Sequence, residues 1–238
     1  EGLYVLNNKK DAKKAVEKFE EVDRQHPYSE WARKSLIMSA YAYYQAGSYE
    51  ESVTASKRYI ALHPGSPDAA YAQYLIGASY FDEIPDITRD QARTEKALAA
   101  LDEVVRKYPT SEYAVSAKQK MEVARDQLAG KEMAVGRFYQ RANQPLGALN
   151  RYKAVINNEA FQRTSHTPEA LYRLVEVNLS LGLTEEATRN AAVLGHNYPG
   201  SPWYAEAFAL LRERGENPTV QPEGKRESWL QRLIPGGA

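Results

Sequence analysis

Small and apolar residues recur along this chain at helical spacing before a repeated proline. The positions twelve, eight and five residues before Pro27, Pro64, Pro109 and Pro199 share this character. They are Ala15, Ser52, Ala97 and Ala187, then Phe19, Ser56, Leu101 and Ala191, then Val22, Tyr59, Val104 and Leu194. Steps of four and three residues keep side chains on one face of a helix. We therefore expect four helices that each bury one stripe.

Each of these prolines belongs to a recurring phrase in which an aromatic residue or His precedes Pro, and Ser and then Ala follow. Proline ends the incoming helix because its ring cannot continue the hydrogen-bond ladder. The serines of the four phrases are Ser29, Ser66, Ser111 and Ser201. Each is placed to cap the next helix by accepting a backbone N–H. Pro67 and Pro202 then fall at the first helical position, where a missing donor costs little.

The spacing of the phrases indicates a repeat array. Their prolines lie 37, 45 and 90 residues apart, and the preceding segments carry a small residue followed by Tyr, as in Gly136 and Tyr139. This is the pattern of tetratricopeptide repeats. We expect an all-α, helical-repeat solenoid of about five tetratricopeptide-like helix pairs. The first pair keeps mainly its second helix at 10–26, and the others span about 29–63, 66–108, 112–158 and 167–198, before a capping helix at 201–213.

Irregularities in the array predict where it departs from an ideal repeat. We expect an insertion at 82–94, and an extended helix from 111 to about 129 that turns at Gly130 before a further helix. We divide the chain into N-terminal repeats at 1–110, C-terminal repeats at 111–213 and a tail at 214–238. Glycine and proline make 214–227 a linker, and 228–234 reads as a short amphipathic helix.

Composition excludes several classes of protein. The 31 basic and 31 acidic residues balance, which argues against a general nucleic-acid binder. The chain has no Cys, so disulfides and thiolate metal sites are excluded. No apolar run approaches the ~20 residues that span a bilayer. The chain begins at Glu1 without Met, so we expect a processed or trimmed fragment.

We find no sequence signature of an enzyme. The glycines are scattered at turns and form no phosphate loop, and the four histidines lie far apart in sequence. Acidic pairs such as Glu50 and Glu51 read as solvated helix faces. We therefore expect no catalytic residue, no metal and no cofactor.

Peptide binding is the better interpretation, because the first helix of each pair lines a groove in such arrays. The expected groove residues are Ile37, Tyr41, Tyr44, Tyr71, Tyr74 and Phe81. Tyrosine offers apolar area and a hydrogen-bonding tip at little entropic cost, which suits peptide capture. The alternative is that these side chains fill contacts between helices.

One stretch of the chain is strongly basic. From 131 to 153 there are five bases, Lys131, Arg137, Arg141, Arg151 and Lys153, against the single acid Glu132. Arg137 and Arg141 are four residues apart and share a helix face. Arginine pairs well with carboxylates, so these bases predict contact with an acidic partner surface; solvated side chains are the alternative.

The order and irregular spacing of several segments indicate which family of repeat proteins this chain resembles. They are residues 24–29, 36–44, 58–64, 90–92, 108–113, 138–141 and 148–152. Over residues 3–212 the chain resembles the BamD family, the tetratricopeptide lipoproteins of the β-barrel assembly machinery of Gram-negative bacteria.

This resemblance implies a periplasmic protein held by lipid at the outer membrane. It implies that the C-terminal repeats bind the periplasmic domain of the barrel-forming subunit, with accessory lipoproteins as further partners. It also implies that the N-terminal repeats receive the targeting signal of unfolded outer-membrane proteins. Arg151 matches an arginine that the family uses toward the barrel subunit. The lipid-bearing Cys is not among the residues of this chain.

Two other functions stay open at this point. One is a cell-envelope scaffold of the Tol-associated tetratricopeptide type, which carries similar phrases but usually also an N-terminal coiled coil. The other is a murein hydrolase on a helical scaffold, which would need a catalytic acid in a cleft.

Overall fold

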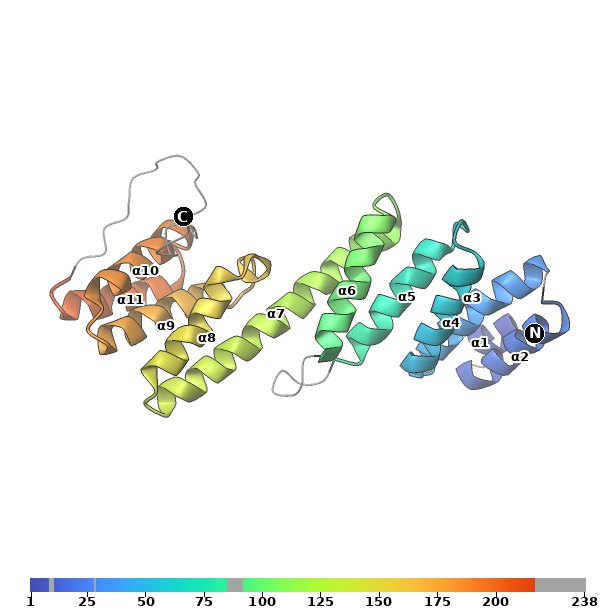
Figure 1. The fold of residues 1–238 in the computed structure, drawn as a ribbon, viewed down its shortest axis with the longest axis horizontal. Helices are drawn as coiled ribbons and strands as arrows, with labels where there is room; N and C mark the ends of the chain where they lie inside the picture. Colours follow the sequence, from blue (N-terminus) through green and yellow to red (C-terminus); the bar gives the residue numbers. More distant parts are fainter. Residues whose placement is uncertain (9–10, 28, 85–91, 217–238) are drawn as a thin grey trace. The chain divides into compact units, whose positions relative to one another are not determined.

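The structure, a computed structural model, describes residues 1–8, 11–27, 29–84 and 92–216. Within these ranges the chain forms eleven α-helices, one short 3-10 helix and no strand (Figure 1). The helices are α1 (Gly2–Asn8), α2 (Ala12–Gln25), α3 (Glu30–Gln45), α4 (Tyr49–Leu62), α5 (Ala69–Asp82), α6 (Ala92–Lys107), α7 (Glu112–Arg141), α8 (Pro145–Asn157), η1 (Glu159–Phe161), α9 (Thr167–Ser180), α10 (Thr184–Asn197) and α11 (Pro202–Glu213). The predicted all-α helical-repeat class is confirmed.

The chain divides into two compact units, and each is described by itself. Unit 1 is Glu1–Ala124 and unit 2 is Arg125–Ala238. The boundary lies inside α7, whereas the sequence pattern places it at 110/111. In unit 1, each helix from α1 to α5 packs against the next, up to α6, and in unit 2 α11 packs against both α9 and α10. Packing between chain neighbours is what a repeat array requires.

The predicted stripe is buried. Of its twelve positions only Val22 is half-buried; the others are buried in α2, α4, α6 and α10. Tyr59, Leu101, Val104 and Leu194 are the largest of those that are fully enclosed. The small residues of the stripe, such as Ala97 and Ala187, let the paired helices approach closely.

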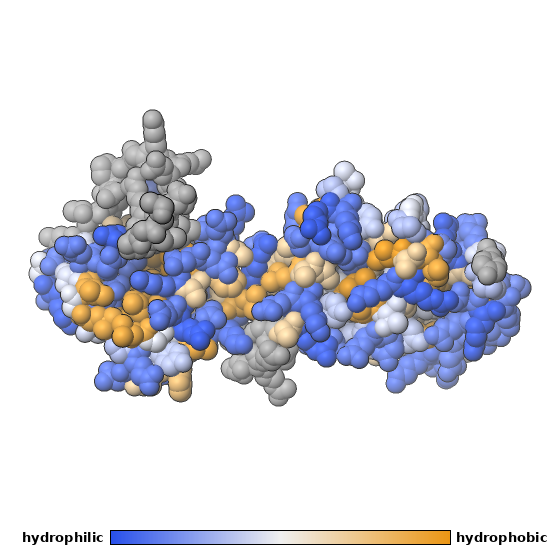
Figure 2. All heavy atoms as spheres, in the orientation of Figure 1, coloured by the Kyte–Doolittle hydropathy of each residue, from blue (hydrophilic) through white to orange (hydrophobic). Residues whose placement is uncertain are grey.

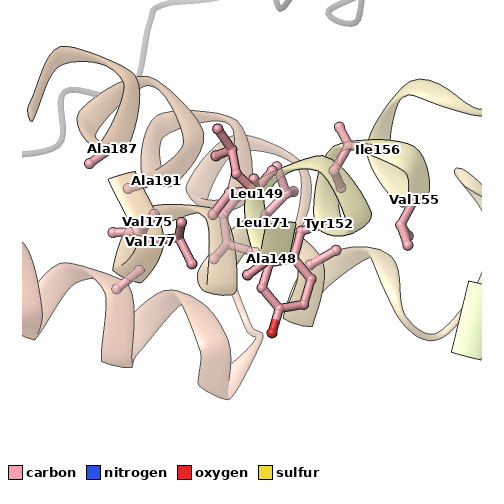
Figure 3. Packing of buried hydrophobic residues seen from close by; sticks show 14 of the residues in the cluster. Ala148, Leu149, Tyr152, Val155, Ile156, Leu171, Val175, Val177, Ala187 and Ala191 are labelled. Atoms are coloured by element: carbon pink, nitrogen blue, oxygen red, sulfur yellow. The ribbon is translucent and has the colours of Figure 1, made fainter. Parts of the chain in front are cut away.

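The largest core lies in unit 2 (Figure 3). It includes Ala148, Leu149, Tyr152, Val155 and Ile156 of α8, Leu171 and Val175 of α9, and Ala187 and Ala191 of α10. Apolar burial is the main favourable term in folding, about 25 cal/mol per Å² removed from water. Three successive helices are therefore held together by one continuous core.

The first helix pair is more complete than the sequence predicts. A helix, α1, precedes α2, and its Val5 and Leu6 are buried against Val16 and Phe19. The second helix, α2, falls within the predicted 10–26, whereas the short first helix was not predicted. The seven residues of α1 are too few to display a helical period, so tertiary packing decides their conformation.

The predicted serine caps form at two of the four helices and not at the other two. Ser29 Oγ accepts the N–H of Ala32 at 3.0 Å, and Ser111 Oγ accepts that of Ala114 at 3.3 Å. Ser201 precedes α11, which begins at Pro202 as predicted, but makes no side-chain capping bond.

Ser66 and Pro67 depart from the prediction. The α5 helix begins only at Ala69, so Pro67 precedes the helix. Ser66 Oγ bonds the Tyr59 hydroxyl at 2.7 Å and accepts the Asp68 N–H at 3.3 Å. The capping prediction is wrong for Ser66 because a neighbouring buried tyrosine takes its hydroxyl.

The predicted turn at Gly130 is also wrong, because α7 runs unbroken through this residue and is 30 residues long. Gly130 is buried, and a Cβ there would lie 2.9 Å from His166 Nε2. The glycine therefore serves close packing inside a helix. Helix α5 ends at Asp82 and α6 begins at Ala92. The core of the predicted insertion at 85–91 and the predicted tail segments from 217 onward lie outside the described residues.

Candidate protein-binding surfaces

Four tyrosines of unit 1 form a row that we call the tyrosine surface: Tyr41, Tyr71, Tyr74 and Tyr113. Tyr41 belongs to α3, Tyr71 and Tyr74 to α5, and Tyr113 to α7. The ring centroids of Tyr41 and Tyr71 are 6.4 Å apart, and Tyr113 lies 5.1 Å from Tyr71 and 5.6 Å from Tyr74. All four are half-buried. Tilted rings at these distances attract each other, so three helices contribute to one aromatic surface.

Two further predicted residues are linked through Asp82. The Tyr44 hydroxyl donates to Asp82 Oδ2. Lys120 Nζ lies 3.4 Å from Asp82 Oδ1 and 4.2 Å from the centroid of the Phe81 ring. Tyr44 therefore contacts the acid, and Phe81 the base, of one Asp82–Lys120 ion pair in unit 1.

Ile37 has a different place. Only 6% of it is exposed, and it packs in a core cluster with Leu36 and Tyr59. Tyr41, Tyr44 and Tyr71 pack against the same cluster. Ile37 therefore belongs to the buried cluster against which these tyrosines pack.

Burial sets the charge state of these phenols. It raises the pKa of Tyr71, Tyr74 and Tyr113 above the usual value for tyrosine. Burial, and then the Asp82 carboxylate, raise the pKa of Tyr44 in the same way. The phenols therefore stay neutral at physiological pH and present rings with hydroxyl tips.

The sequence prediction of the groove did not include Tyr113. The signal that would have found it is its position two residues after Ser111, in the first turn of a predicted helix.

Two of the predicted bases of unit 2 form ion pairs with carboxylates of the same unit. Arg137 Nη1 donates to both carboxylate oxygens of Glu169 on α9, each at 2.9 Å. Arg151 Nη1 donates to Glu132 Oε2 on α7 at 3.1 Å, and its side chain is 44% exposed. Two of the arginines are thus partly neutralised by their own chain.

Arg141 and Lys153 are exposed, and neither has an ion-pair partner within the described ranges. Lys153 borders a small cavity with Glu186 and Asn190 of α10. Residues two apart on a helix do not face each other, so Lys153 and Arg151 leave α8 in different directions.

A second aromatic group in unit 2 escaped the sequence prediction. The rings of Tyr172 and Trp203 stack at 5.3 Å, and the Arg173 guanidinium lies 5.3 Å and 5.6 Å from their centroids. Arg173 also bonds Glu176 at 2.7 Å and Glu169 at 3.4 Å. The residues come from α9 and α11, so only the fold brings them together.

Two large apolar side chains are exposed at the α7–α8 turn of unit 2. Phe138 and Leu146, on either side of the α7–α8 turn, are 61% and 64% exposed. Figure 2 shows hydrophobic side chains among hydrophilic ones on the surface of each unit. Large exposed apolar residues are common where proteins meet partners.

Along the described chain, no helix has the length and apolar character to cross a bilayer. Nor do three or more His, Asp or Glu side chains of the described ranges gather where they could hold a metal ion.

Comparison with known proteins decides the family. The family described as YfiO, outer membrane lipoprotein, matches residues 4–194. A protein of Caulobacter vibrioides named outer membrane protein assembly factor BamD is 53% identical over 222 residues, which cover 92% of this chain and 72% of the relative. The chain belongs to the BamD family. A BamD of Rickettsia prowazekii is 43% identical over 89% of this chain and 83% of its own length.

A more distant relative extends the BamD family match. BamD of Neisseria meningitidis serogroup A is 31% identical over 84% of this chain and 78% of its own length. A solved tetratricopeptide-repeat protein of Thermus thermophilus aligns with 88% of this chain and 96% of its own, at 19% identity and a TM-score of 0.36. The tyrosine surface and the bases of unit 2 lie within the residues that match the BamD family.

Proposed function

We propose that this chain is a non-catalytic component of the outer-membrane β-barrel assembly machinery. In this proposal unit 1 receives the targeting signal of unfolded outer-membrane proteins, and unit 2 binds the periplasmic domain of the barrel-forming subunit, with accessory lipoproteins as further partners. The protein would work at the periplasmic face of the outer membrane, attached by lipid. Membership of a family whose relatives are named outer membrane protein assembly factors supports this role.

The tyrosine surface is the observation that carries the first part. Its neutral, half-buried rings come from three helices, so an extended peptide would meet apolar faces and hydroxyl donors together. Such a surface suits aromatic and aliphatic side chains of an unfolded segment. Lys120, near Phe81, adds a cation beside it.

Arg151 supports the second part. Its guanidinium is half exposed although it bonds Glu132, so donors remain for a carboxylate of a partner. Arg141 and Lys153 add positive charge in unit 2. Arg137 has its N–H groups directed at Glu169, and we assign it the role of holding α7 against α9.

The test is the affinity of this chain for the purified periplasmic domain of the barrel subunit. We expect Arg151→Glu to weaken binding at least about tenfold, which corresponds to about 1.4 kcal/mol. Arg189→Glu is the matched control, because Arg189 also forms one ion pair, with Glu186, and is 43% exposed. Equal affinities of the two variants would remove Arg151 from the interface.

A further inference from the structure

A hollow with acidic borders lies in unit 1 among α2, α3 and α4. Its volume is about 410 Å³, within the ~300–1,000 Å³ of typical ligand sites. Leu36, Ser39 and Tyr43 of α3 line it. They follow one helical stripe, whereas Tyr41 and Tyr44 follow another. The hollow is therefore separate from the tyrosine surface.

Carboxylates approach the hollow from two helices. Glu20 and Asp23 lie on α2, Glu50 and Glu51 begin α4, and Arg58 is the one base among the lining residues. Four acids against one base leave a net charge of three negative. Clefts lined by one sign of charge concentrate ligands of the opposite sign.

The chain's own groups satisfy these carboxylates only in part. Arg58 Nη2 lies 2.8 Å from Asp23 Oδ2, and the Tyr43 hydroxyl donates to Glu20 Oε1 at 2.7 Å. Burial, followed by this hydrogen bond, raises the pKa of Tyr43 to about 12, so it donates as a neutral phenol. Arg93 Nη2 lies 3.6 Å from Glu50 Oε1, whereas Glu51 has no ion-pair partner among the residues that the structure describes. Arg58 shows that a guanidinium fits the chemistry of this hollow.

Ser39 provides a second, independent observation. Ser39 is only 3% exposed and lines the hollow, and its hydroxyl makes no hydrogen bond within the described part of the chain. The side chain is thus nearly enclosed, and its hydroxyl has acceptor capacity that the chain itself does not use. A hydroxyl at the lining of an acidic hollow is therefore suited to accept a hydrogen bond from a cationic donor.

We propose that this acidic hollow binds an arginine or lysine side chain of an extended basic segment of a partner protein. The charged end donates to the carboxylates of Glu50 and Glu51 and reaches the Ser39 hydroxyl. The aliphatic stem lies against Leu36 and Ala55, as such stems do on apolar surface. The site is independent of the signal and the barrel subunit proposed above.

The test uses a short peptide with arginine at alternate positions and its counterpart with neutral citrulline. Titration of the ¹⁵N-labelled protein at low salt should shift the amide resonances of Ser39 and Glu51 with the arginine peptide alone. The double variant Glu50→Gln and Glu51→Gln should weaken binding about fivefold or more, since each exposed pair contributes up to about a fivefold change.

The matched control is Glu185→Gln with Glu186→Gln, which makes the same charge change in the first turn of α10. This variant should bind the arginine peptide as the unchanged protein does. Ser39→Ala should weaken binding without changing the fold, as judged by circular dichroism. Equal binding of both peptides, or equal losses in the two double variants, would overturn the proposal.

Discussion

The ring of Tyr152 lies directly against the backbone of Gly136. A Cβ added to Gly136 would stand 2.5 Å from Tyr152 Cε1, closer than real contacts allow. Tyr152 is fully buried, and its hydroxyl donates to Gln140 Oε1 at 2.8 Å. The ring therefore fixes how closely α7 and α8 approach within unit 2.

We expect Gly136→Ala to destabilise the protein. Alanine gains about 1 kcal/mol of helix propensity over glycine, but overpacking a core costs ~1–3 kcal/mol. The Tyr152 ring cannot move aside because it is enclosed and hydrogen-bonded, so we predict a net loss of roughly 1 kcal/mol. Urea unfolding followed by circular dichroism measures it. Gly200→Ala, with nothing within 4 Å of its added Cβ, should not destabilise; equal effects would contradict this account.

The repeats show how far the sequence predicts this fold. The small residues before each proline have fixed helical spacing, so their burial could be read from the chain. Gly130 could not, because a glycine inside a helix and one at a turn look alike in sequence. Only the approach of His166, which directly precedes α9, distinguishes them.

The candidate sites were less predictable for a similar reason. Local charge counting marks Arg137 as a free cation, but its partner Glu169 is 32 residues away. Tyr113 and Trp203 join aromatic groups only after α7 and α11 fold onto their neighbours. The acidic hollow combines acids of α2 and α4, each pair of which reads as an ordinary solvated face.

The Arg137–Glu169 pair should stabilise unit 2. We expect a double-mutant cycle with Arg137→Met and Glu169→Gln to give a coupling of about 1 kcal/mol, within the ~0.5–3 kcal/mol of contacting pairs. The free energy of unfolding of the four proteins measures it. Arg141→Met should change stability by less than about 0.5 kcal/mol, as exposed sites do. A coupling of zero would show that Arg137 does not stabilise unit 2 through Glu169.

Alkaline pH should weaken the fold through Tyr152. Burial raises its pKa to about 12, against a usual value near ~10. The folded state holds the proton more tightly, so this stabilisation is complete below pH ~10 and is lost as pH rises toward 12. Urea unfolding at several pH values should show a shallower alkaline decline for Tyr152→Phe. Tyr4→Phe, at an exposed position, is the control; identical declines in both variants would contradict the assignment.

The tyrosine surface should determine affinity for targeting-signal peptides. We expect Tyr71→Leu to weaken binding of a C-terminal peptide from an outer-membrane protein about fivefold, because aromatic pairing contributes ~0.5–1.5 kcal/mol beyond buried area. Fluorescence anisotropy of a labelled peptide measures it. Tyr4→Leu removes an exposed tyrosine of α1 and should have no effect. Unchanged binding by Tyr71→Leu would exclude this surface.

Membership of the assembly machinery is the central claim, and co-purification from outer-membrane extracts of the source bacterium tests it most directly. The tagged protein, expressed at its natural level, is captured and its partners are identified by mass spectrometry. We predict recovery of the barrel-forming subunit, with less of it when Arg151→Glu is captured than when Arg189→Glu is. Recovery of Tol-associated proteins in place of the barrel subunit would contradict the account.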